Sequence, residues 1–488
     1  TEIYTLSLHD ALPICRHGHA VVEWIARYFE NIEQYPVRSG VSPGGVKNAL
    51  PDMPPAGSEP FDRFMQDFDE IIIPGITHWQ SPNFFAYFPA NSSPPSVLAE
   101  MLTAALGAQC MLWETSPAAA ELEEKMMEWL KVMTGLPPEF EGVIQDSASS
   151  ATLAALITAR EKITRFRSNA EGLRDAEHLR IYASTQTHSS VEKGAGVAGF
   201  GRNNVVRLKV RNDFSMDPEA LEKAIVRDLH DGYTPCCAVA TLGTTGTTAI
   251  DPLRAVGEVC RKYGVWLHVD AALGGTALLL PEMRWMTDGI EYADSFVFNP
   301  HKWMFTNFDC SAYFVRDAAS LIRSFEILPE YLKTRTRGAV NDYRDWGIPL
   351  GRRFRALKLW AVIRSYGVER LQSMIREHIR LAKMLAGLIE ADSNFELMAP
   401  VPLNTVCFRY CPATLSDKDA NILNEKLNHA LNDTGKIYLT HTRVNGRYVL
   451  RMVTAQTSVT ERHVLRAWDL IRETASAFPP KDGAVDVD

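Results

Sequence analysis

The sequence predicts an α/β protein with a mainly parallel central sheet that is flanked by helices. The first observation is a series of short apolar runs, at 238–242, 265–269, 295–298 and 311–315. The second is that helical segments separate these runs, and that Asp217 and Asp251 each stand before a proline. An Asp N-cap followed by Pro at the first helical position is a common helix start. Strands that alternate with capped helices are typical of βαβ units and therefore of a parallel sheet.

The amino-terminal part is predicted to be helical. Four apolar residues from Val21 to Tyr28 fall at i, i+3, i+4 and i+7, which gives a helix one apolar face. A loop rich in proline and glycine follows at 36–60. A second helical stretch is predicted to end at Pro74, and a third helix covers 121–131.

The middle of the chain continues the alternation. Strands are also predicted at 143–145 and 180–183, and Ser147 precedes a helix. The helix that starts with Asp251 as N-cap is predicted to end at Gly264, because glycine is the usual residue just past a helix end.

The carboxyl-terminal part is predicted to combine long helices with a few strands. Strand-like runs lie at 405–409 and 448–452. The last helix is predicted to open with a capping box from Ser458 to Glu461. Its apolar face is formed by Val464, Trp468 and Ile471.

The composition excludes several classes of protein. Of the 488 residues, 46% are hydrophobic and 23% are charged, which is ordinary for a globular protein and unlike a disordered or fibrous one. The net charge of −8 argues against a nucleic-acid partner. The longest stretch without charge, 71–99, contains five prolines and cannot be a membrane-spanning helix. We therefore expect neither nucleic acid nor a membrane as a partner.

The eight cysteines are spread thinly over the chain. This spacing is typical of buried, reduced thiols in a cytoplasmic protein, since secreted disulfide-rich domains are short and dense in cysteine. The adjacent pair at 236–237 lacks the spacing of a zinc motif, and we predict no metal site. No secretory signal is visible, so we expect a cytoplasmic location.

Polar residues stand at the carboxyl ends of the predicted strands, where open α/β sheets bind ligands. Asp270, Lys302 and His188 each follow one strand, and Ala148 and Ser149 open the helix after another. Such an Asp is often only a cap or turn residue, and such a Lys is often a solvated charge. Together, however, they suit pyridoxal phosphate, which needs a lysine for an imine bond, a carboxylate at its pyridine nitrogen, a helix N-terminus for its phosphate and a flat group on its ring.

Longer motifs support this hypothesis. They are FFAYFP at 84–89, YASTQTHSSVEK at 182–193, LHVDAA at 267–272, NPHKW at 299–303 and YRDWGIPLGRR at 343–353. In this order they resemble the group II pyridoxal-phosphate decarboxylases, the aromatic-L-amino-acid decarboxylase family. The similarity runs from about Arg16 to about Ala475.

The resemblance implies the fold type I architecture of pyridoxal-phosphate enzymes, and an obligate homodimer with the active site at the subunit interface. The implied division is a non-native or disordered leader at 1–15, an N-terminal helical segment at 16–93 that wraps the partner, a large cofactor-binding α/β domain at 94–355, a small C-terminal α+β domain at 356–478 and a disordered tail at 479–488.

The resemblance also implies roles for single residues. Lys302 is the Schiff-base lysine, Asp270 pairs with the pyridine nitrogen, and His188 stacks on the ring. Tyr331 falls where the family has its mobile-loop tyrosine, the proposed proton donor to the substrate Cα. The implied cofactor contacts are Ala148, Ser149, His188, Thr245, Asp270, Asn299 and Lys302.

The implied reaction is decarboxylation of an aromatic L-amino acid (tryptophan, tyrosine, phenylalanine or dihydroxyphenylalanine) to the arylalkylamine and CO2. Relatives that act as oxygen-dependent aldehyde synthases commonly carry phenylalanine for the tyrosine or asparagine for the histidine. This chain keeps both Tyr331 and His188, which favours amine formation over aldehyde formation.

The substrate pocket is also assigned by resemblance. Trp79, Tyr87 and Phe88 would form an aromatic wall for a flat side chain. Gly351 lies where plant relatives tend to have glycine for indolic substrates, which favours tryptophan, although a lineage difference explains it equally well. The remaining pocket positions, which differ from those of animal relatives, are Ala90, Gln109 and Met111, the last two expected from the neighbouring subunit.

Other interpretations fit the sequence less well. The run GAGVAG at 194–199 matches a dinucleotide-binding motif, but a polar, helix-like stretch precedes it where a strand is required. A binding protein that has lost the chemistry would not be expected to keep Lys302, Asp270, His188 and Tyr331. Within the family, decarboxylation of histidine or glutamate stays open. Glutamate would need a cationic anchor, which the aromatic wall does not offer.

Overall fold

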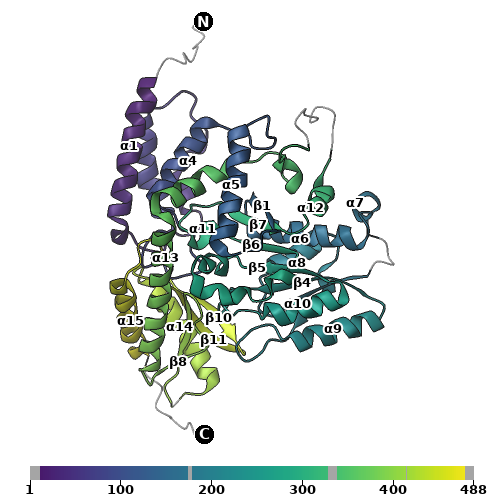
Figure 1. The fold of residues 1–488 in the computed structure, drawn as a ribbon. Helices are drawn as coiled ribbons and strands as arrows, with labels where there is room; N and C mark the ends of the chain where they lie inside the picture. The colour runs from purple at the N-terminus through teal and green to yellow at the C-terminus, as the bar shows by residue number, and fades with distance from the viewer. Residues whose placement is uncertain (1–10, 174–177, 328–337, 414, 479–488) are drawn as a thin grey trace.

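The computed structural model describes residues 11–173, 178–327, 338–413 and 415–478. The chain begins with α1 (Ala11–Glu30), which stands at one side of the molecule (Figure 1). The short helices α2 (Gly45–Ala49) and α3 (Phe61–Asp67) follow. Helix α1 extends into the predicted leader, and residues 1–10 lie outside the described part of the chain.

A seven-stranded sheet forms the centre of the molecule (Figure 1). Its strand order is β1-β7-β6-β5-β4-β2-β3, and only β7 runs antiparallel to the others. The strands are β1 (Glu141–Gln145), β2 (Leu179–Ser184), β3 (Val205–Leu208), β4 (Thr234–Thr241), β5 (Trp266–Asp270), β6 (Ser295–Phe298) and β7 (Ser311–Val315). The prediction of a mainly parallel sheet is therefore confirmed.

Helices cover both faces of this sheet, which is why its central strands are buried along their whole length. One face packs on α5 (Pro117–Thr134), α9 (Pro218–His230), α10 (Leu253–Tyr263) and the first part of α13 (Arg355–Glu390). The other face packs on α6 (Ala148–Ile163), α8 (Ser190–Val197) and α12 (Ala318–Phe325). The remaining helices before α13 are α4 (Pro94–Leu106), α7 (Ser168–Glu171) and α11 (Pro300–Trp303).

A second, antiparallel sheet follows α13, which bends at Gly367. Its order is β10-β11-β9-β8, with β8 (Phe395–Leu397), β9 (Thr405–Tyr410), β10 (Thr440–Val444) and β11 (Arg447–Val453). Its core includes α14 (Asp417–Asp433), α15 (Glu461–Ser476) and the end of α13. The amino-terminal segment joins this core, because the N–H of Phe85 donates to the carbonyl of Tyr438 at 3.0 Å and the N–H of Val453 donates to the carbonyl of Phe85 at 3.0 Å.

Most predicted elements are confirmed, and two helix starts are corrected. The carboxylate of Asp251 does not cap α10, because it accepts the backbone N–H groups of Met216 and Thr241, at 2.6 and 2.7 Å. The capping box of α15 uses Thr460 and His463 in place of the predicted pair at 458 and 461. Asp217, by contrast, caps α9 as predicted.

The structure also bears on the expectations about membrane-spanning helices and cysteines. Within the described ranges, no helix is both long enough and apolar enough to cross a membrane. The eight cysteines are free thiols, and six of them are buried. The predicted disordered tail at 479–488 lies outside the described residues, and the proposed domain boundaries stay predictions.

Candidate active site

A cavity of about 230 Å³ opens at the carboxyl ends of the parallel strands. It brings together Asp270, Lys302 and His188, which are far apart in the sequence. Its lining residues are Phe88, Ser147, Ala148, Ser149, His188, Thr241, Gly243, Thr245, Asp270, Ala272, Asn299, His301 and Lys302. All seven predicted cofactor contacts therefore lie in this inner cavity.

Lys302 is held by the short helix α11, which follows β6 directly. Its neighbour Trp303 is fully buried and donates its indole N–H to Nδ1 of His378 at 2.9 Å, which ties α11 to α13. Burial lowers the pKa of Lys302, the nearby Asp270 carboxylate acts in the opposite direction, and Arg451 adds to the lowering. A lysine with a lowered pKa is more often neutral and so more nucleophilic.

Asp270 is the last residue of β5. It is buried and lines the inner cavity. Its Oδ1 accepts the backbone N–H of Ala272 at 3.0 Å, which fixes the side chain. The turn after β5 packs tightly on β4, since a Cβ on Gly274 would lie 2.3 Å from the carbonyl oxygen of Leu242. Glycine is required there so that the two strand ends can approach each other.

An anion-binding end is provided by α6. Ser147 is the N-cap, and its Oγ accepts the N–H of Ser150 at 3.2 Å. Ala148 and Ser149 form the first turn, whose backbone N–H groups have no partner within a helix and favour a negative charge. Asn299 lines the same cavity, and its Oδ1 accepts the hydroxyl of Ser311 at 2.6 Å, while its amide N–H groups have no partner among the described residues.

His188 forms a flat wall between the inner cavity and the space outside it. Its Nδ1 accepts the backbone N–H of Ser190 at 3.2 Å and lies 2.9 Å from the Ser190 hydroxyl. Burial lowers the pKa of His188, with the charge of Lys302 acting in the same direction and that of Asp270 against it. A neutral imidazole is therefore the expected form near pH 7.

A larger outer chamber, of about 630 Å³, adjoins the inner cavity. Phe88, His188 and Thr245 line both spaces. The outer chamber is also lined by residues of the second sheet, among them Arg451 on β11, and by Tyr87 of the amino-terminal segment. A ligand that fills both spaces therefore contacts all three parts of the chain.

Thr241 and Arg451 are among the lining residues that were not singled out from the sequence. Thr241 ends β4 opposite Asp270, and its buried Oγ1 has no hydrogen-bond partner among the described residues. The sequence could have indicated Thr241, because ligands bind at the carboxyl ends of parallel strands and Thr241 stands just before the loop that carries Thr245. Arg451 gave no such signal, since it lies inside a strand of the other sheet.

The predicted substrate pocket is only partly assembled within one chain. Tyr87 and Phe88 line the outer chamber, and Trp79 stacks on Tyr87 with ring centres 5.7 Å apart without lining either space. Ala90 lines neither space, and its carbonyl accepts the side-chain amide of Gln80 at 2.7 Å.

Three other predicted pocket residues gather at a different place. Oε1 of Gln109 accepts the N–H of Arg352 at 2.6 Å, next to Gly351, and the carbonyl of Met111 accepts the N–H of Arg344 at 3.0 Å. They do not line the inner cavity or the outer chamber of the same chain. Tyr331 lies outside the described residues.

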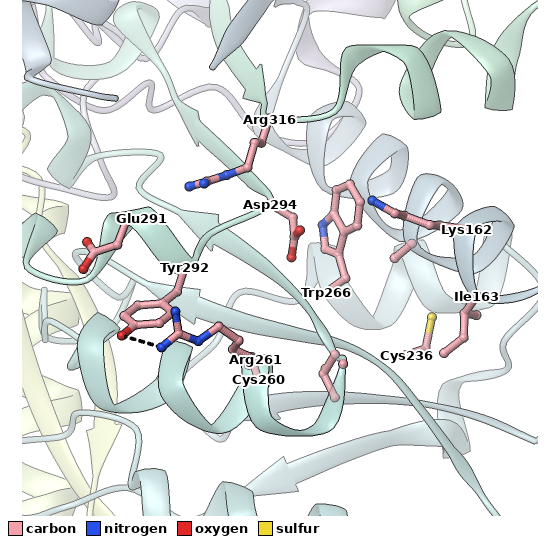
Figure 2. Close-up of a pocket in the computed structure, with 13 residues that line it drawn as sticks. Lys162, Ile163, Cys236, Cys260, Arg261, Trp266, Glu291, Tyr292, Asp294 and Arg316 are labelled. Carbon is pink, nitrogen blue, oxygen red and sulfur yellow. Dashed lines mark hydrogen bonds between the residues drawn. The ribbon is translucent and has the colours of Figure 1, made fainter. Parts of the chain in front are cut away.

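Another pocket, of about 500 Å³, lies at the amino ends of β4, β5 and β6 (Figure 2). Figure 2 shows Lys162 of α6 beside the Trp266 ring of β5, and Arg261 of α10 directed toward Tyr292, to whose hydroxyl its Nη2 donates at 3.2 Å. None of the predicted site residues belongs to it. The candidate active site is therefore at the opposite edge of the sheet, where the strand ends carry the chemistry.

Comparison with known proteins agrees with this geometry. The conserved domain of pyridoxal-dependent decarboxylases matches residues 43–411. Phenylacetaldehyde synthase of Arabidopsis thaliana is 44% identical over 477 residues, which cover 96% of each chain. Tyrosine decarboxylase 2 of Narcissus pseudonarcissus is 42% identical over 477 residues, which cover 96% of this chain and 95% of the relative.

A solved structure has the same fold. The crystal structure of Catharanthus roseus tryptophan decarboxylase in complex with L-tryptophan superposes with a TM-score of 0.91. The two sequences are 40% identical, and the match covers 96% of this chain and 99% of that one. The likeness therefore extends over both sheets and the amino-terminal helices.

Proposed function

This chain belongs to the family of pyridoxal-dependent decarboxylases, and on that premise we propose that it converts an aromatic L-amino acid to the arylalkylamine and CO2. Pyridoxal phosphate is its cofactor. The observation that carries the proposal is the inner cavity, which places Lys302, Asp270, His188 and the N-terminus of α6 around one space.

The residues of the inner cavity fit this cofactor. Lys302 offers an amine of lowered pKa to its aldehyde, and Asp270 offers a fixed carboxylate to its ring nitrogen. The first turn of α6 suits a phosphate. The unpartnered hydroxyl of Thr241 is a further polar group that a bound ring with oxygen and nitrogen atoms can satisfy.

The chain's own residues perform distinct tasks in the reaction. When bound, pyridoxal phosphate supplies an electron sink for the electron pair of the broken Cα–carboxylate bond. Asp270 would keep a proton on the ring nitrogen, which would make that sink effective. With the cofactor bound, His188 would cover its ring as a flat, neutral wall, and Lys302 would hold it through its amine. We assign the later protonation of Cα to Tyr331, as the family resemblance implies.

We propose a homodimer whose partner completes the substrate pocket. Gln109, Met111 and Gly351 lie away from the inner cavity of their own chain, as residues that serve a neighbouring site would. The face of α4 that carries Leu98, Leu102 and Leu106 is more than half exposed at each of these positions. Such a contiguous apolar stripe suits burial against a second copy. The cytoplasmic location stays a prediction.

An oxygen-dependent aldehyde synthase is the second candidate. It is favoured by the 44% identity to phenylacetaldehyde synthase, a value similar to that of the decarboxylases. The chain keeps His188, whose imidazole lines the inner cavity, and Tyr331. Both residues favour protonation of Cα and hence amine release, so decarboxylation to the amine is the main proposal.

Product analysis tests the proposal. The cofactor-loaded protein is incubated with each aromatic L-amino acid and with histidine and glutamate, and amine, aldehyde and peroxide are measured. Amine without peroxide is expected from one or more aromatic substrates. Aldehyde with peroxide would assign the second candidate, and Lys302→Ala should abolish both products together with the visible absorbance of the lysine-bound cofactor.

A further inference from the structure

The pocket of about 500 Å³ at the amino ends of β4, β5 and β6, which we call the base pocket, has walls that are largely apolar (Figure 2). Small-molecule sites commonly have volumes of roughly 300–1,000 Å³ and apolar linings. The apolar part of this lining consists of Ala159, Ile163, Cys236 and Cys260 together with the rings of Trp266 and Tyr292. A space of this size and lining suits the flat apolar side chain of a small molecule.

Arg261 gives the base pocket a positive charge that no described carboxylate pairs with. It stands in the last turn of α10 and is exposed, so its donors can be reached from solvent. Its guanidinium carbon lies 4.4 Å from the ring centre of Tyr292, and its Nη2 donates to the Tyr292 hydroxyl at 3.2 Å. These contacts hold the guanidinium at the wall of the pocket, where it can accept an anionic group.

Asp294 gives the same pocket a negative charge that no described cation pairs with. Its Oδ2 accepts the backbone N–H of Leu267 at 2.8 Å, whereas Oδ1 has no hydrogen-bond partner within the described ranges and is not closed off from the pocket. Burial raises the pKa of Asp294, and the N–H of Leu267 and the charges of Lys162 and Arg316 act in the opposite direction. A partly buried carboxylate without an ion pair favours a cationic ligand beside its open oxygen.

The remaining charges of the base pocket already have partners. Nζ of Lys162 lies 2.9 Å from a carboxylate oxygen of Asp317, and Glu291 pairs with Arg254 at 2.9 Å. Nε of Arg316 donates to a backbone carbonyl at 3.1 Å, and its Nη2 is buried inside the protein. The pocket therefore keeps one accessible cation and one accessible carboxylate that do not pair with each other, and a ligand that carries both charges can satisfy both.

We propose that the base pocket binds an aromatic amino acid as a zwitterion, at a site separate from the inner cavity. The carboxylate of the ligand pairs with the Arg261 guanidinium, its ammonium group donates to Oδ1 of Asp294, and its ring lies on the apolar walls. This inference goes beyond the proposed function, because the base pocket lies at the opposite edge of the sheet and contains none of the residues assigned to the reaction.

Binding of an amino acid and its two half-analogues tests this assignment. The cofactor-loaded protein is first blocked with phenylhydrazine, which reacts with the aldehyde of pyridoxal phosphate and prevents turnover. L-Phenylalanine, 3-phenylpropanoate and phenethylamine are then titrated by calorimetry. We expect one molecule of L-phenylalanine to bind per chain, and both half-analogues to bind more weakly because each lacks one of the two charges.

Two variants assign the two ends of the ligand. Arg261→Gln should weaken L-phenylalanine and 3-phenylpropanoate by roughly 3- to 10-fold, since the lost pair is partly exposed, and should change phenethylamine by less than about 2-fold. Asp294→Asn should weaken L-phenylalanine and phenethylamine by roughly 10- to 100-fold and leave 3-phenylpropanoate within about 2-fold. Asparagine keeps an oxygen that can accept the N–H of Leu267, so the fold should persist.

Matched controls remove the same charges nearby. Lys262→Gln alters the next residue of α10, which pairs with Glu222 and does not line the base pocket. Asp288→Asn removes a carboxylate that pairs with Arg254 outside the pocket. Both should leave all three affinities within about 2-fold. Arg261→Glu, at an exposed position, should weaken 3-phenylpropanoate and strengthen phenethylamine, and it supplies the test if Asp294→Asn does not fold.

Three results would overturn the proposal. They are an absence of L-phenylalanine binding to the blocked protein, an equal loss of all three ligands in Arg261→Gln or Asp294→Asn, and binding of L-alanine as tight as that of L-phenylalanine. The last result would remove the aromatic part of the assignment. None of these measurements involves turnover, so they are independent of the product analysis, which alone decides the proposed reaction.

Discussion

Replacing Thr241 by valine is expected to stabilise the protein without cofactor and to weaken cofactor binding. The side chain is 4% exposed, and its hydroxyl has no partner among the described residues. An unsatisfied buried hydroxyl costs about 1–3 kcal/mol, and a methyl group of similar shape removes that cost. With the cofactor bound, the same change removes one hydrogen bond, so affinity should fall by roughly 2- to 10-fold.

Two measurements separate these effects. Guanidinium chloride unfolding of the apoprotein should show a higher midpoint for Thr241→Val than for the parent. Titration with pyridoxal phosphate, followed by visible absorbance, should show the weaker affinity. Thr276→Val is the matched control, because the Thr276 hydroxyl is also buried without a described partner but does not line the inner cavity.

The control should gain stability and keep the parent affinity. A Thr241→Val apoprotein that unfolds more easily than the parent, or that binds the cofactor as tightly, would refute the reasoning. The first result would mean that the hydroxyl is satisfied within the protein. The second would mean that it does not face the cofactor.

Three other perturbations probe the surroundings of the site. Burial raises the pKa of Asp251 to about 7 from an ordinary 3.8, so folding takes up a proton there and stability falls as pH rises through this interval, by roughly 4 kcal/mol in total. Asp251→Asn should flatten the pH dependence of the unfolding midpoint between about pH 4 and 7. An unaltered slope would contradict the shift. Arg352→Met should cost about 3–5 kcal/mol, because the buried Glu123 carboxylate loses its partner, and Glu123→Leu in the same chain should recover most of this loss in denaturant unfolding. Tyr331→Phe should lower amine output and produce aldehyde and peroxide, and a variant that makes only amine at the parental rate would remove Tyr331 from the protonation step.

Local sequence patterns predicted most of the fold because the signals are short in range. The boundaries of β6 and β7 agree with the apolar runs at 295–298 and 311–315. Asp217 caps α9, and Gly264 ends α10 with φ of 66°. Each of these features depends on neighbours within a few residues, so hydrophobic periodicity and capping preferences are sufficient to predict them.

The failed helix starts have a tertiary cause. Asp251 has the sequence of a cap, yet its carboxylate is drawn to N–H groups of Met216 and Thr241. A buried carboxylate takes whichever donors the fold offers, and here two buried backbone N–H groups compete better than a helix end. At α15 the competing cap, Thr460 with His463, lies only two residues further along.

The sequence alone predicted the residues of the candidate cofactor site. Asp270, His188, Lys302 and the first turn of α6 each follow a strand, and parallel strands bring their carboxyl ends to one edge of the sheet. Only the tertiary structure decided that Thr241 lines the inner cavity and Arg451 the outer chamber, and that Gln109, Met111 and Gly351 line neither. The physical reason is that strand order and the docking of a second sheet depend on packing between distant segments. Burial and unpaired donors arise only after that packing is formed.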